Sequence, residues 1–558
     1  MSGFAMTAIF TLLLSVFVAS TAGILVVKND GVVEQSSAFL DEYGRLYDHR
    51  HANITIVKMT YSGGVFEVTV KNTGNVVLDP DHVFLAVDGD MLPEGGFSVD
   101  LAQGSSAGYW DPAEELRLRL NRDFGPGWHT VSVANGKGVT AEKRFYMPYD
   151  AMMVYYDSFA TRLPRYRLWD GSAWSDEGSA GNVGGDVRWM VLKASPTRNE
   201  YALVTLDGNG DINGQVWQNG SWLGPLEMSS GIDSRYRGFD VEYEQVSGDV
   251  MVVYSDGTSI PKYLVWDGEA ITQTGSVMPI GSGVPRWIVL ASDPNSDEII
   301  LMTLDTNRDI YAQVWNGNSW GNVQLLELSA ETNTRQCFDA AYESTSGRAL
   351  VVWADSRQRR PQYRIWTGSS WTIEASANDV GSSNIYWIRL ASEPGSDRIL
   401  MGTLDRANDV NVQIWTGSFW GTNLEVTRGA ESDNRRTFDV AFEGSSGIGM
   451  ISYGESNDRP RFRTCTGQCF ASDWSLENSA NDVNPAGGDP EWIQLIPDPN
   501  SNDIFLMHAD DARDIGIQRW VGSLPWIDAN NVETRSRFDY EAFSMAFRQH
   551  YPGGYAWD

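Results

Sequence analysis

The sequence predicts an all-β protein with an N-terminal transmembrane or stalk helix, in which a β-sandwich is followed by an eight-bladed β-propeller closed by the C-terminal strand. Three observations lead to this fold class. Residues 3–27 contain no charge, residues 53–149 alternate like strands, and the remainder repeats about every 50 residues. The predicted domains are an anchor helix and stalk at 1–50, the sandwich at 51–149 and the propeller at 150–558.

The composition is that of a folded, acidic protein. Of its 558 residues, 42% are hydrophobic, and 73 acidic against 42 basic residues leave a formal charge of -31. Binding to phosphate backbones needs a basic surface, so nucleic acid is excluded as a partner class. The length exceeds that of one typical hydrophobic core and predicts two or three domains.

The first 50 residues predict attachment to a membrane. The charge-free run from Gly3 to Val27 is long enough to span a bilayer. A cleaved signal peptide is the alternative, but no basic residue precedes the run, and it stays apolar beyond the only cleavage-like site. Residues 30–50 continue with helical spacing, as a stalk would. We therefore expect a single-pass protein of the cell membrane with extracellular domains.

The next hundred residues predict a small β-sandwich. Phe66, Val68 and Val70 alternate with polar residues, which places one face of that strand inward. Asn72-Thr-Gly74 and Asp88-Gly89 supply turns between strands.

The N-terminal 150 residues also resemble a known family. A charge-free helix, a short stalk and a β-domain with Lys71-Asn-Thr-Gly74 and Leu78-Asp-Pro80 are similar to the FlaF/FlaG accessory proteins of the archaeal flagellum (archaellum), relatives of archaellins and pilins. The resemblance implies a helix in the membrane or a filament core, and surface-layer protein or archaellum or pilus subunits as partners. This chain differs in lacking the basic cleavage signal of archaellins and in carrying about 400 further residues.

Two markers alternate through these further residues. An aromatic strand begins at Trp189, Trp287, Trp387 and Trp492, and a Phe-Asp pair stands at Phe239, Phe338, Phe438 and Phe538. Successive markers are separated by 50, 48, 51, 49, 51, 54 and 46 residues. Each unit accommodates four strands, which is the format of a propeller blade, so eight markers predict eight blades.

The two ends of the repeat region predict how the ring closes. Phe538 lies about 20 residues from the end of the sequence, so its blade lacks later strands, whereas residues 151–174 supply later strands without a first. A C-terminal strand pairing into the N-terminal blade resolves both deficits. A seven-bladed ring, a split array and an open solenoid are the alternatives, although a solenoid would leave exposed edges.

An Asp recurs at the end of the second strand of the predicted blades. In the Trp-type blades it is followed four residues later by a second Asp, and the first Asp of each pair is Asp207, Asp305, Asp405 and Asp510. A turn is the structural interpretation, because Asp side chains accept hydrogen bonds from backbone amides shortly downstream. A calcium site is the alternative, but Asp207 lacks the downstream bidentate Glu of a calcium loop. No other cofactor is expected.

Four arginines precede the Phe-Asp strands by three or four residues, namely Arg235, Arg335, Arg435 and Arg535. Strand direction places them on the same face as the Asp-rich turns. Asp–Arg pairs between neighbouring blades are the structural expectation. A ligand carboxylate or anionic sugar held by an arginine is the functional alternative, because the guanidinium fork suits planar acids.

Trp-rich hairpins recur in nearly every unit, for example as "WDGSAW" and "WNGNSW". Glycine turns and cross-strand packing explain them as architecture, whereas a lectin would use such aromatic faces to stack on sugars. Cys465 and Cys469 are a candidate extracellular disulfide, with an inert pair as the alternative, and Cys337 alone suggests packing. Asn53 and Asn219 begin candidate glycosylation sequons.

No catalytic motif points to an enzyme, since the six histidines lack metal spacing and no nucleophile or phosphate motif occurs. The sequence favours an archaeal, membrane-anchored surface protein, a structural or interaction component of the archaellum or a related pilus that binds surface-layer or filament partners. A surface lectin or adhesin that binds glycans is the second hypothesis, and an extracellular glycan-active enzyme is the third.

Overall fold

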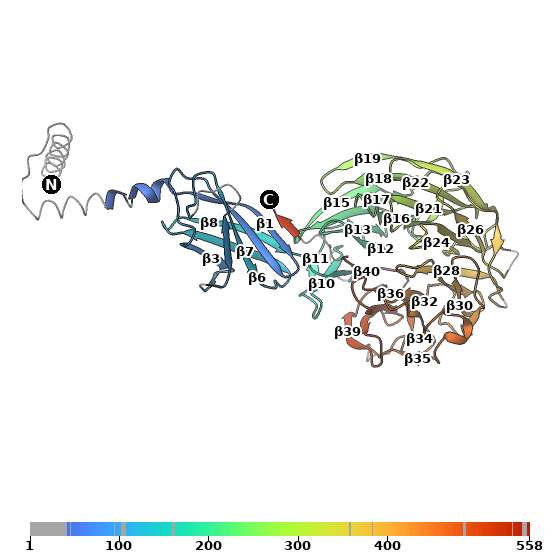
Figure 1. Cartoon of the computed structure of the whole chain (residues 1–558). Coiled ribbons are helices and arrows are strands. Elements are labelled where there is room, and N and C mark those ends of the chain that lie inside the picture. The colour runs from blue at the N-terminus through green and yellow to red at the C-terminus, as the bar shows by residue number, and fades with distance from the viewer. Residues whose placement is uncertain are drawn as a thin grey trace, which may run out of the picture. The chain divides into compact units, whose positions relative to one another are not determined.

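The computed structural model describes residues 42–44, 46–93, 95–101, 108–158, 162–356, 359–381, 383–483, 487–537, 539–549 and 555–557. These residues form two compact units (Figure 1). The first comprises the described residues up to 123 together with 129–145 and 555–557, and the second comprises 124–128 and 146–549. Most of the second unit is therefore inserted in the chain between two parts of the first.

The first unit is built from two antiparallel sheets, with the orders β41-β1-β2-β6-β5 and β4-β3-β7-β8. The strands are β1 (Ile54–Ser62), β2 (Val65–Asn72), β3 (Val83–Val87), β4 (Asp90–Met91), β5 (Ser98–Leu101), β6 (Glu115–Asn121), β7 (Gly127–Asn135), β8 (Thr140–Met147) and β41 (Tyr555–Trp557). Phe66, Val68 and Val70 of β2 are fully buried, as their alternation predicts. The core of this unit therefore comes from alternate strand residues.

The turn after β2 is fixed by one buried side chain. The Asn72 amide donates to the carbonyls of Val76 and Trp110, both at 3.0 Å, and its Oδ1 accepts the Gly74 amide at 3.0 Å. A Cβ at position 74 would lie 2.3 Å from the His51 carbonyl oxygen, so only glycine fits there.

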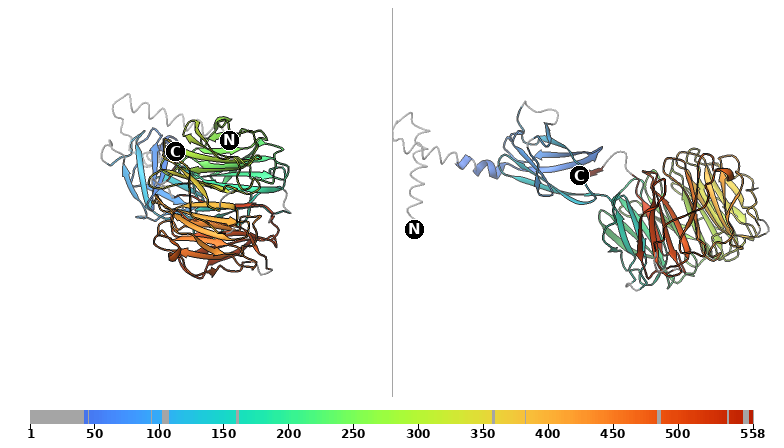
Figure 2. Two further views of the ribbon diagram at one scale, coloured as in Figure 1. Left: turned by 90° about the vertical axis from the view of Figure 1, so that its right-hand side faces the viewer. Right: turned by 90° about the horizontal axis from the view of Figure 1, so that it is seen from below.

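The C-terminal strand β41 belongs to the first unit, whereas the sequence assigned every residue after 149 to the propeller. It pairs antiparallel with β1, with Ala556 opposite Thr60, and Figure 2 shows it beside the blue strands. The Trp557 ring lies 5.0 Å from Phe145 and 6.3 Å from Phe66. Aromatic packing thus adds to backbone pairing in holding this strand.

The second unit consists of eight four-stranded antiparallel sheets, each of which we call a blade. Blade 1 joins β40 (Phe543–Phe547) to β9 (Ala151–Tyr155), β10 (Arg165–Trp169) and β11 (Gly178–Ser179). Blade 2 contains β12 (Val187–Ala194), β13 (Glu200–Asp207), β14 (Ile212–Gln218) and β15 (Ser221–Ser229), and blade 3 contains β16 (Phe239–Tyr243), β17 (Val250–Tyr254), β18 (Lys262–Trp266) and β19 (Ile271–Ser276). Blade 4 contains β20 (Pro285–Ser292), β21 (Glu298–Asp305), β22 (Ile310–Asn316) and β23 (Trp320–Glu327), and blade 5 contains β24 (Phe338–Tyr342), β25 (Ala349–Trp353), β26 (Gln362–Trp366) and β27 (Ala375–Ser376).

The remaining blades follow the same order along the chain. Blade 6 contains β28 (Ile385–Ser392), β29 (Ile399–Asp405), β30 (Val410–Trp415) and β31 (Leu424–Thr427). Blade 7 contains β32 (Phe438–Phe442), β33 (Gly449–Tyr453), β34 (Arg461–Cys465) and β35 (Asn478–Ser479), and blade 8 contains β36 (Pro490–Pro497), β37 (Ile504–Asp510), β38 (Ile515–Trp520) and β39 (Ile527–Glu533).

The first strand of each blade lies innermost, and these strands surround the centre of the ring (Figure 1). Each inner strand contacts the inner strands of both neighbouring blades, and β40 contacts β36 and β12. The inner strand of blade 1 begins at Phe543 and not at the predicted Phe538, which lies outside the described residues. Phe543 follows Trp492 by 51 residues and so keeps the period better than Phe538 does.

The predicted fold class is wrong in its N-terminal helix. In the part of the chain that the structure describes, helix is confined to 42–44, 46–51 and the short 3-10 helix Ala471–Asp473, and none of these is long and apolar enough to cross a membrane. The helical residues 42–44 and 46–51 include Glu42, Asp48 and Arg50, which are too polar for a bilayer core. The predicted span at 3–27 lies outside the described residues.

Candidate functional site

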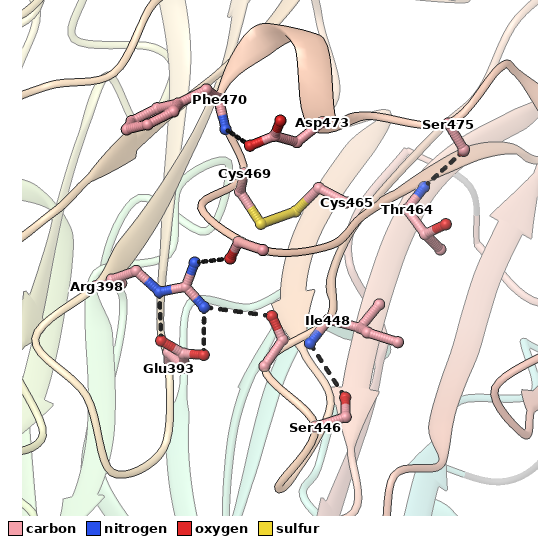
Figure 3. Close-up of a disulfide and its surroundings, with 12 residues drawn as sticks. Glu393, Arg398, Ser446, Ile448, Thr464, Cys465, Cys469, Phe470, Asp473 and Ser475 are labelled. Atoms are coloured by element: carbon pink, nitrogen blue, oxygen red, sulfur yellow. Dashed lines mark hydrogen bonds and ion pairs between the residues drawn. A yellow bond between two sulfur atoms is a disulfide. The ribbon is translucent and has the colours of Figure 1, made fainter.

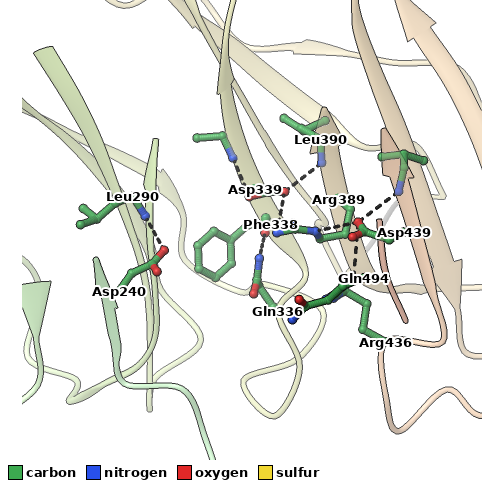
Figure 4. Close-up of polar contacts among 12 residues, drawn as sticks. Asp240, Leu290, Gln336, Phe338, Asp339, Arg389, Leu390, Arg436, Asp439 and Gln494 are labelled. Atoms are coloured by element: carbon green, nitrogen blue, oxygen red, sulfur yellow. Dashed lines mark hydrogen bonds and ion pairs between the residues drawn. The ribbon is translucent and has the colours of Figure 1, made fainter. Parts of the chain in front are cut away.

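Two kinds of blade alternate around the ring, so the junctions between neighbouring blades are also of two kinds. Odd-numbered blades carry the Phe-Asp inner strand, with Phe543-Ser544 in blade 1, and even-numbered blades carry the Trp inner strand. At each odd-to-even junction a side chain of the odd blade accepts a backbone amide of the next inner strand. The pairs are Leu290 to Asp240 at 2.9 Å, Leu390 to Asp339 at 2.8 Å, Leu495 to Asp439 at 3.0 Å and Leu192 to Ser544 at 3.1 Å. The Asp of the Phe-Asp marker is thus an inter-blade acceptor (Figure 4).

Four tryptophans from the even blades meet at the centre of the ring. Trp189, Trp287, Trp387 and Trp492 are almost fully buried, and each ring meets the next edge to face, with centroids 5.3 to 5.7 Å apart around a closed cycle. This edge-to-face geometry is the favoured one for aromatic rings. The four rings therefore tie together blades that are not sequence neighbours.

Residues of the inner strands also line a polar cavity of about 540 Å³. Arg389 lies between two aspartates, with its Nε 3.2 Å from Asp439 Oδ1 and its Nη1 3.6 Å from Asp339 Oδ2 (Figure 4). Lys193 Nζ lies 2.5 Å from Glu242. Burial raises the pKa of Asp339, and this outweighs the opposite effect of Arg389. These charges pair with one another between the inner strands of neighbouring blades, which satisfies groups that would be costly to bury alone.

The predicted Asp residues Asp207, Asp305, Asp405 and Asp510 are all buried, and they form turns. The Oδ1 atom of each accepts the backbone amide four residues downstream, at 2.8 to 3.0 Å. Burial raises the pKa of Asp207, Asp305 and Asp405, and it outweighs the lowering effect of these amides. This geometry supports the turn interpretation over ligand binding. Among the residues described, no group of three or more His, Cys, Asp or Glu could hold a metal, and calcium binding stays a prediction.

The predicted arginines share a face of the ring with these turns. The loop before each odd inner strand contacts the Asp turn of the preceding even blade, through the amides of Ile232, Ala330, Ala430 and Ser536, which donate to turn carbonyls at 2.8 to 3.1 Å. Arg235 pairs with Asp233 in its own loop, Arg335 donates to the Asp433 carbonyl, Arg435 pairs with Glu491 and Asp539, and Arg535 lies 3.9 Å from Asp157. Three of the four arginines therefore link one loop to another.

The Trp hairpins connect adjacent blades. A Trp at the end of the third strand donates its indole N–H to a Glu of the preceding blade, in the pairs Trp315 to Glu244, Trp366 to Glu298, Trp415 to Glu343 and Trp520 to Glu443, at 2.5 to 2.9 Å. In the pairs of Glu244, Glu343 and Glu443 both partners are buried, where such a bond is hard to replace with water, and the pair of Glu298 is partly buried. The architectural interpretation therefore fits these four hairpins.

Blade 7 departs from this pattern and confirms the predicted disulfide (Figure 3). Cys465 ends the third strand where blades 1, 3 and 5 have Trp169, Trp266 and Trp366, and it is bonded to Cys469. Arg398 of blade 6 stands before β29 in the position of Glu298, and its Nε donates to Glu393 at 2.6 Å. At this junction both members of the Trp–Glu pair are therefore absent, the Trp from blade 7 and the Glu from blade 6.

The other residues singled out from the sequence are at the surface or in the core. Asn53 and Asn219 are exposed, and their glycosylation stays a prediction. Cys337 is fully buried, and burial raises the pKa of its thiol to about 12. Its side chain packs in the hydrophobic core, as expected of a lone buried cysteine.

The junction between blades 8 and 1 contains a pocket whose lining is partly polar and partly apolar. The cavity measures about 350 Å³ and is lined by Met153, Arg167, Trp169, Ser172, Ala173, Trp174, Ile517, Asp528, Asn530, Asn531 and Val532. The Trp169 and Trp174 rings are 5.1 Å apart. Arg519 lies 5.1 Å above the Trp169 ring and donates to Asp503 at 3.0 Å and to Asp528 at 2.8 Å.

Within this pocket two donors stand out. The indole Nε1 of Trp174 is buried and has no hydrogen-bond partner among the described residues. The Arg167 side chain also lines the pocket and is half-buried, with its Nε 3.4 Å from the Tyr155 hydroxyl. A buried donor without a partner is costly, and a ligand acceptor would relieve that cost.

Sequence reasoning missed this pocket, although a signal was present. Arg519 occupies the register position of Val216, Val314 and Ile414 in the other even blades. A charged residue in place of three β-branched ones marks the junction where the repeat changes.

No family model and no curated protein matches this chain. The resemblance of its first 150 residues to the FlaF/FlaG family therefore stays a prediction. Similar solved structures include the BP39L lectin from Burkholderia pseudomallei, with 9% identity, 62% of this chain and 99% of the lectin covered, and a TM-score of 0.45. The dihydro-heme d1 dehydrogenase NirN has 10% identity, covers 72% of this chain and 75% of its own, and has a TM-score of 0.47.

The lectin of Aleuria aurantia, a six-bladed β-propeller with fucose recognition, has 12% identity, covers 62% of this chain and 96% of its own, and has a TM-score of 0.35. The ring of the present chain contains eight sheets. At such identities and TM-scores, the likeness assigns neither a ligand nor a function to this chain.

Proposed function

We propose that this chain is a carbohydrate-binding protein that holds a saccharide in the pocket between blades 8 and 1. The pocket itself, which is lined by the Trp169 and Trp174 rings together with the guanidinium of Arg167, is the observation that supports it most. Sugars combine an apolar C–H face, which stacks on aromatic rings, with hydroxyl edges that need donors and acceptors. Arg167, Asp528 and Asn530 supply such groups around the two rings.

The dimensions of the pocket suit a small ligand. Its volume of about 350 Å³ falls in the usual range for small-molecule sites, roughly 300 to 1,000 Å³. The central cavity is larger, but its described charges already pair with one another, as Arg389 does with Asp339 and Asp439. A ligand entering there would have to break those pairs, whereas the indole N–H of Trp174 in the pocket between blades has no partner to lose.

The disulfide supports a location outside the cytosol. Bonds such as Cys465–Cys469 persist in oxidising compartments and are rare where glutathione keeps thiols reduced. An extracellular propeller that binds glycans would act in adhesion or surface recognition. Anchoring in a membrane and partners in an archaellum or surface layer stay predictions from the sequence, which co-purification from native membranes would test.

Glycan arrays followed by calorimetry test the proposal. We expect the full chain to bind one class of glycan, and Trp174→Ala and Arg167→Ala to weaken that binding at least about tenfold, because each removes a direct contact. Trp371→Ala is the matched control, since Trp366 and Trp371 form the same bridge in blade 5 as Trp169 and Trp174 do in blade 1.

The control should bind as the unchanged protein does. Binding that is lost equally in Trp371→Ala and Trp174→Ala would contradict the assigned pocket. Absence of binding to any glycan at millimolar concentration would contradict the function itself.

A further inference from the structure

We propose that the groove between blades 2 and 3 is a second binding site, for a small apolar aromatic ring. This site is separate from the saccharide pocket and does not depend on the proposed carbohydrate binding. It lies at the same kind of even-to-odd junction, but its chemistry is the opposite.

The groove is an apolar cavity of about 150 Å³. Its floor is formed by the buried residues Val204 and Val252, and its rim by Leu223, Leu226 and Ile271, which are 42 to 46% exposed. The side chains of Val216, Met228, Leu264 and Trp266 complete the wall. The rim exposure means that a small molecule can reach the floor from solvent.

The groove offers almost no polar group to hold water. Gln215 is the one polar residue among those that line it, and its side-chain amide is already engaged with Gly181. The Gly181 amide donates to Gln215 Oε1 at 2.6 Å, and Gln215 Nε2 donates to the Gly181 carbonyl at 3.3 Å. A groove without free polar groups favours an apolar ligand, and a volume of about 150 Å³ is large enough for benzene.

The chain itself shows what fits this kind of groove. At the junction of blades 6 and 7, Phe470 packs on Ile414 and Gly421, so closely that a Cβ at position 421 would lie 2.6 Å from the ring. Ile414 and Gly421 occupy the positions of Val216 and Leu223 in blade 2. In blades 1, 5 and 7, Trp174, Trp371 and Trp474 lie opposite the last residue of the third strand, where blade 3 has Ile271 opposite Trp266. Blade 3 therefore lacks the aromatic ring that the other odd blades carry at this position, and a small aromatic ligand would fill the space left there.

One glycine opens the groove in blade 2. Gly214 pairs with Val204 as Ala312 pairs with Met302, Val412 with Gly402 and Ile517 with Met507. A Cβ at 214 would meet the Met228 side chain at 3.4 Å, an ordinary contact, so a larger residue can be introduced there. Gly214 is thus the smallest of the four equivalent residues, and a larger side chain at this position would fill the groove.

The test uses the full chain and benzene as the probe, with binding followed by ligand-observed NMR or calorimetry. We expect saturable binding by the unchanged protein and a loss of affinity of about tenfold or more in Gly214→Val, which fills the groove as Val412 does. Leu226→Asn introduces on the rim the residue type that blade 8 has at the equivalent position, Asn530. Because Leu226 is exposed, the variant should fold. It should weaken binding by about tenfold.

The saccharide-pocket variant Trp174→Ala should bind benzene normally. Benzene binding that is absent from the unchanged protein, or that is as strong in both groove variants as in the unchanged protein, would overturn the proposal. Binding of a Phe-containing peptide at the groove without binding of the free ring would overturn it too, in favour of a protein partner.

Discussion

His508 is a buried base in β37, and the register explains why it is tolerated. It lies opposite Gly516, where a Cβ would approach its ring to 2.4 Å, so the glycine makes room for the imidazole. Thr205, Thr303 and Thr403 occupy the same position in blades 2, 4 and 6. Burial lowers the pKa of His508 from 6.5 to about 4.

The first prediction concerns the pH dependence of stability. Between pH 6.5 and about 4 the unfolded chain binds a proton at His508 that the folded chain does not. The free energy of unfolding should therefore fall across this window, by about 3 kcal/mol from this residue. His508→Thr should remove that component, so denaturant titrations of the two proteins at pH 7 and pH 4.5 should differ in pH slope. Parallel curves would contradict the prediction.

A second residue-scale prediction separates a turn from a metal ligand. Asp305→Ala deprives the amides of Asn307 and Asp309 of their acceptor, which should cost about 1 to 3 kcal/mol of stability. Asp305→Asn keeps an acceptor oxygen and should cost much less. Thermal unfolding with and without calcium measures both effects. A calcium-dependent rise in melting temperature that Asp305→Asn abolishes would favour the metal site instead.

At the scale of blades and strands, the repeat shows what the sequence can and cannot reveal. Trp189 and Phe239 predict where inner strands begin, because a buried aromatic at a fixed period needs no knowledge of the partner strand. Phe538-Asp539 carries the same dipeptide, yet the inner strand begins at Phe543-Ser544. What defines this position is acceptance of the Leu192 amide by Ser544, a contact across about 350 residues of chain. A dipeptide cannot encode such a pairing.

The same limit applies to the candidate site. The turn role of the aspartates is local and follows from the spacing of Asp207 and Asp211. The pocket between blades 8 and 1 joins Arg167 to Asp528, residues brought together only when the ring closes. Its prediction from sequence would require knowing which blades are neighbours and comparing every repeat position in turn.

The disulfide supports a prediction about one blade. Cys465 and Cys469 close a short loop, and the chain-entropy relation gives about 2 kcal/mol for a loop of this length. The double variant Cys465→Ala/Cys469→Ala should lose about that much stability. Reducing agent should destabilise the unchanged protein by a similar amount and leave the double variant unaffected. Equal sensitivity of both proteins to reduction would point to an effect elsewhere.

On the scale of the whole molecule, the chain passes through the first unit, builds the entire ring, and returns to add β41. Deleting residues 555–558 should leave the eight blades intact, because β40 ends at Phe547. The first unit should lose the pairing of β41 with β1 and the packing of Trp557, worth about 2 kcal/mol. Hydrogen exchange should quicken at Met59, Thr60 and Tyr61 and stay unchanged in β24 and β25. Unchanged protection in β1 would contradict this.

The route of β41 has a consequence for how the protein is made. Strands β1 to β8 leave the ribosome first, but the strand that completes their sheet emerges roughly 400 residues later. At about 5 to 20 residues per second, the edge of β1 waits for roughly 20 to 80 seconds. During that time an unpaired strand edge is open to other chains. A holdase that covers this edge during translation would raise the yield of native protein more than one acting on the finished ring.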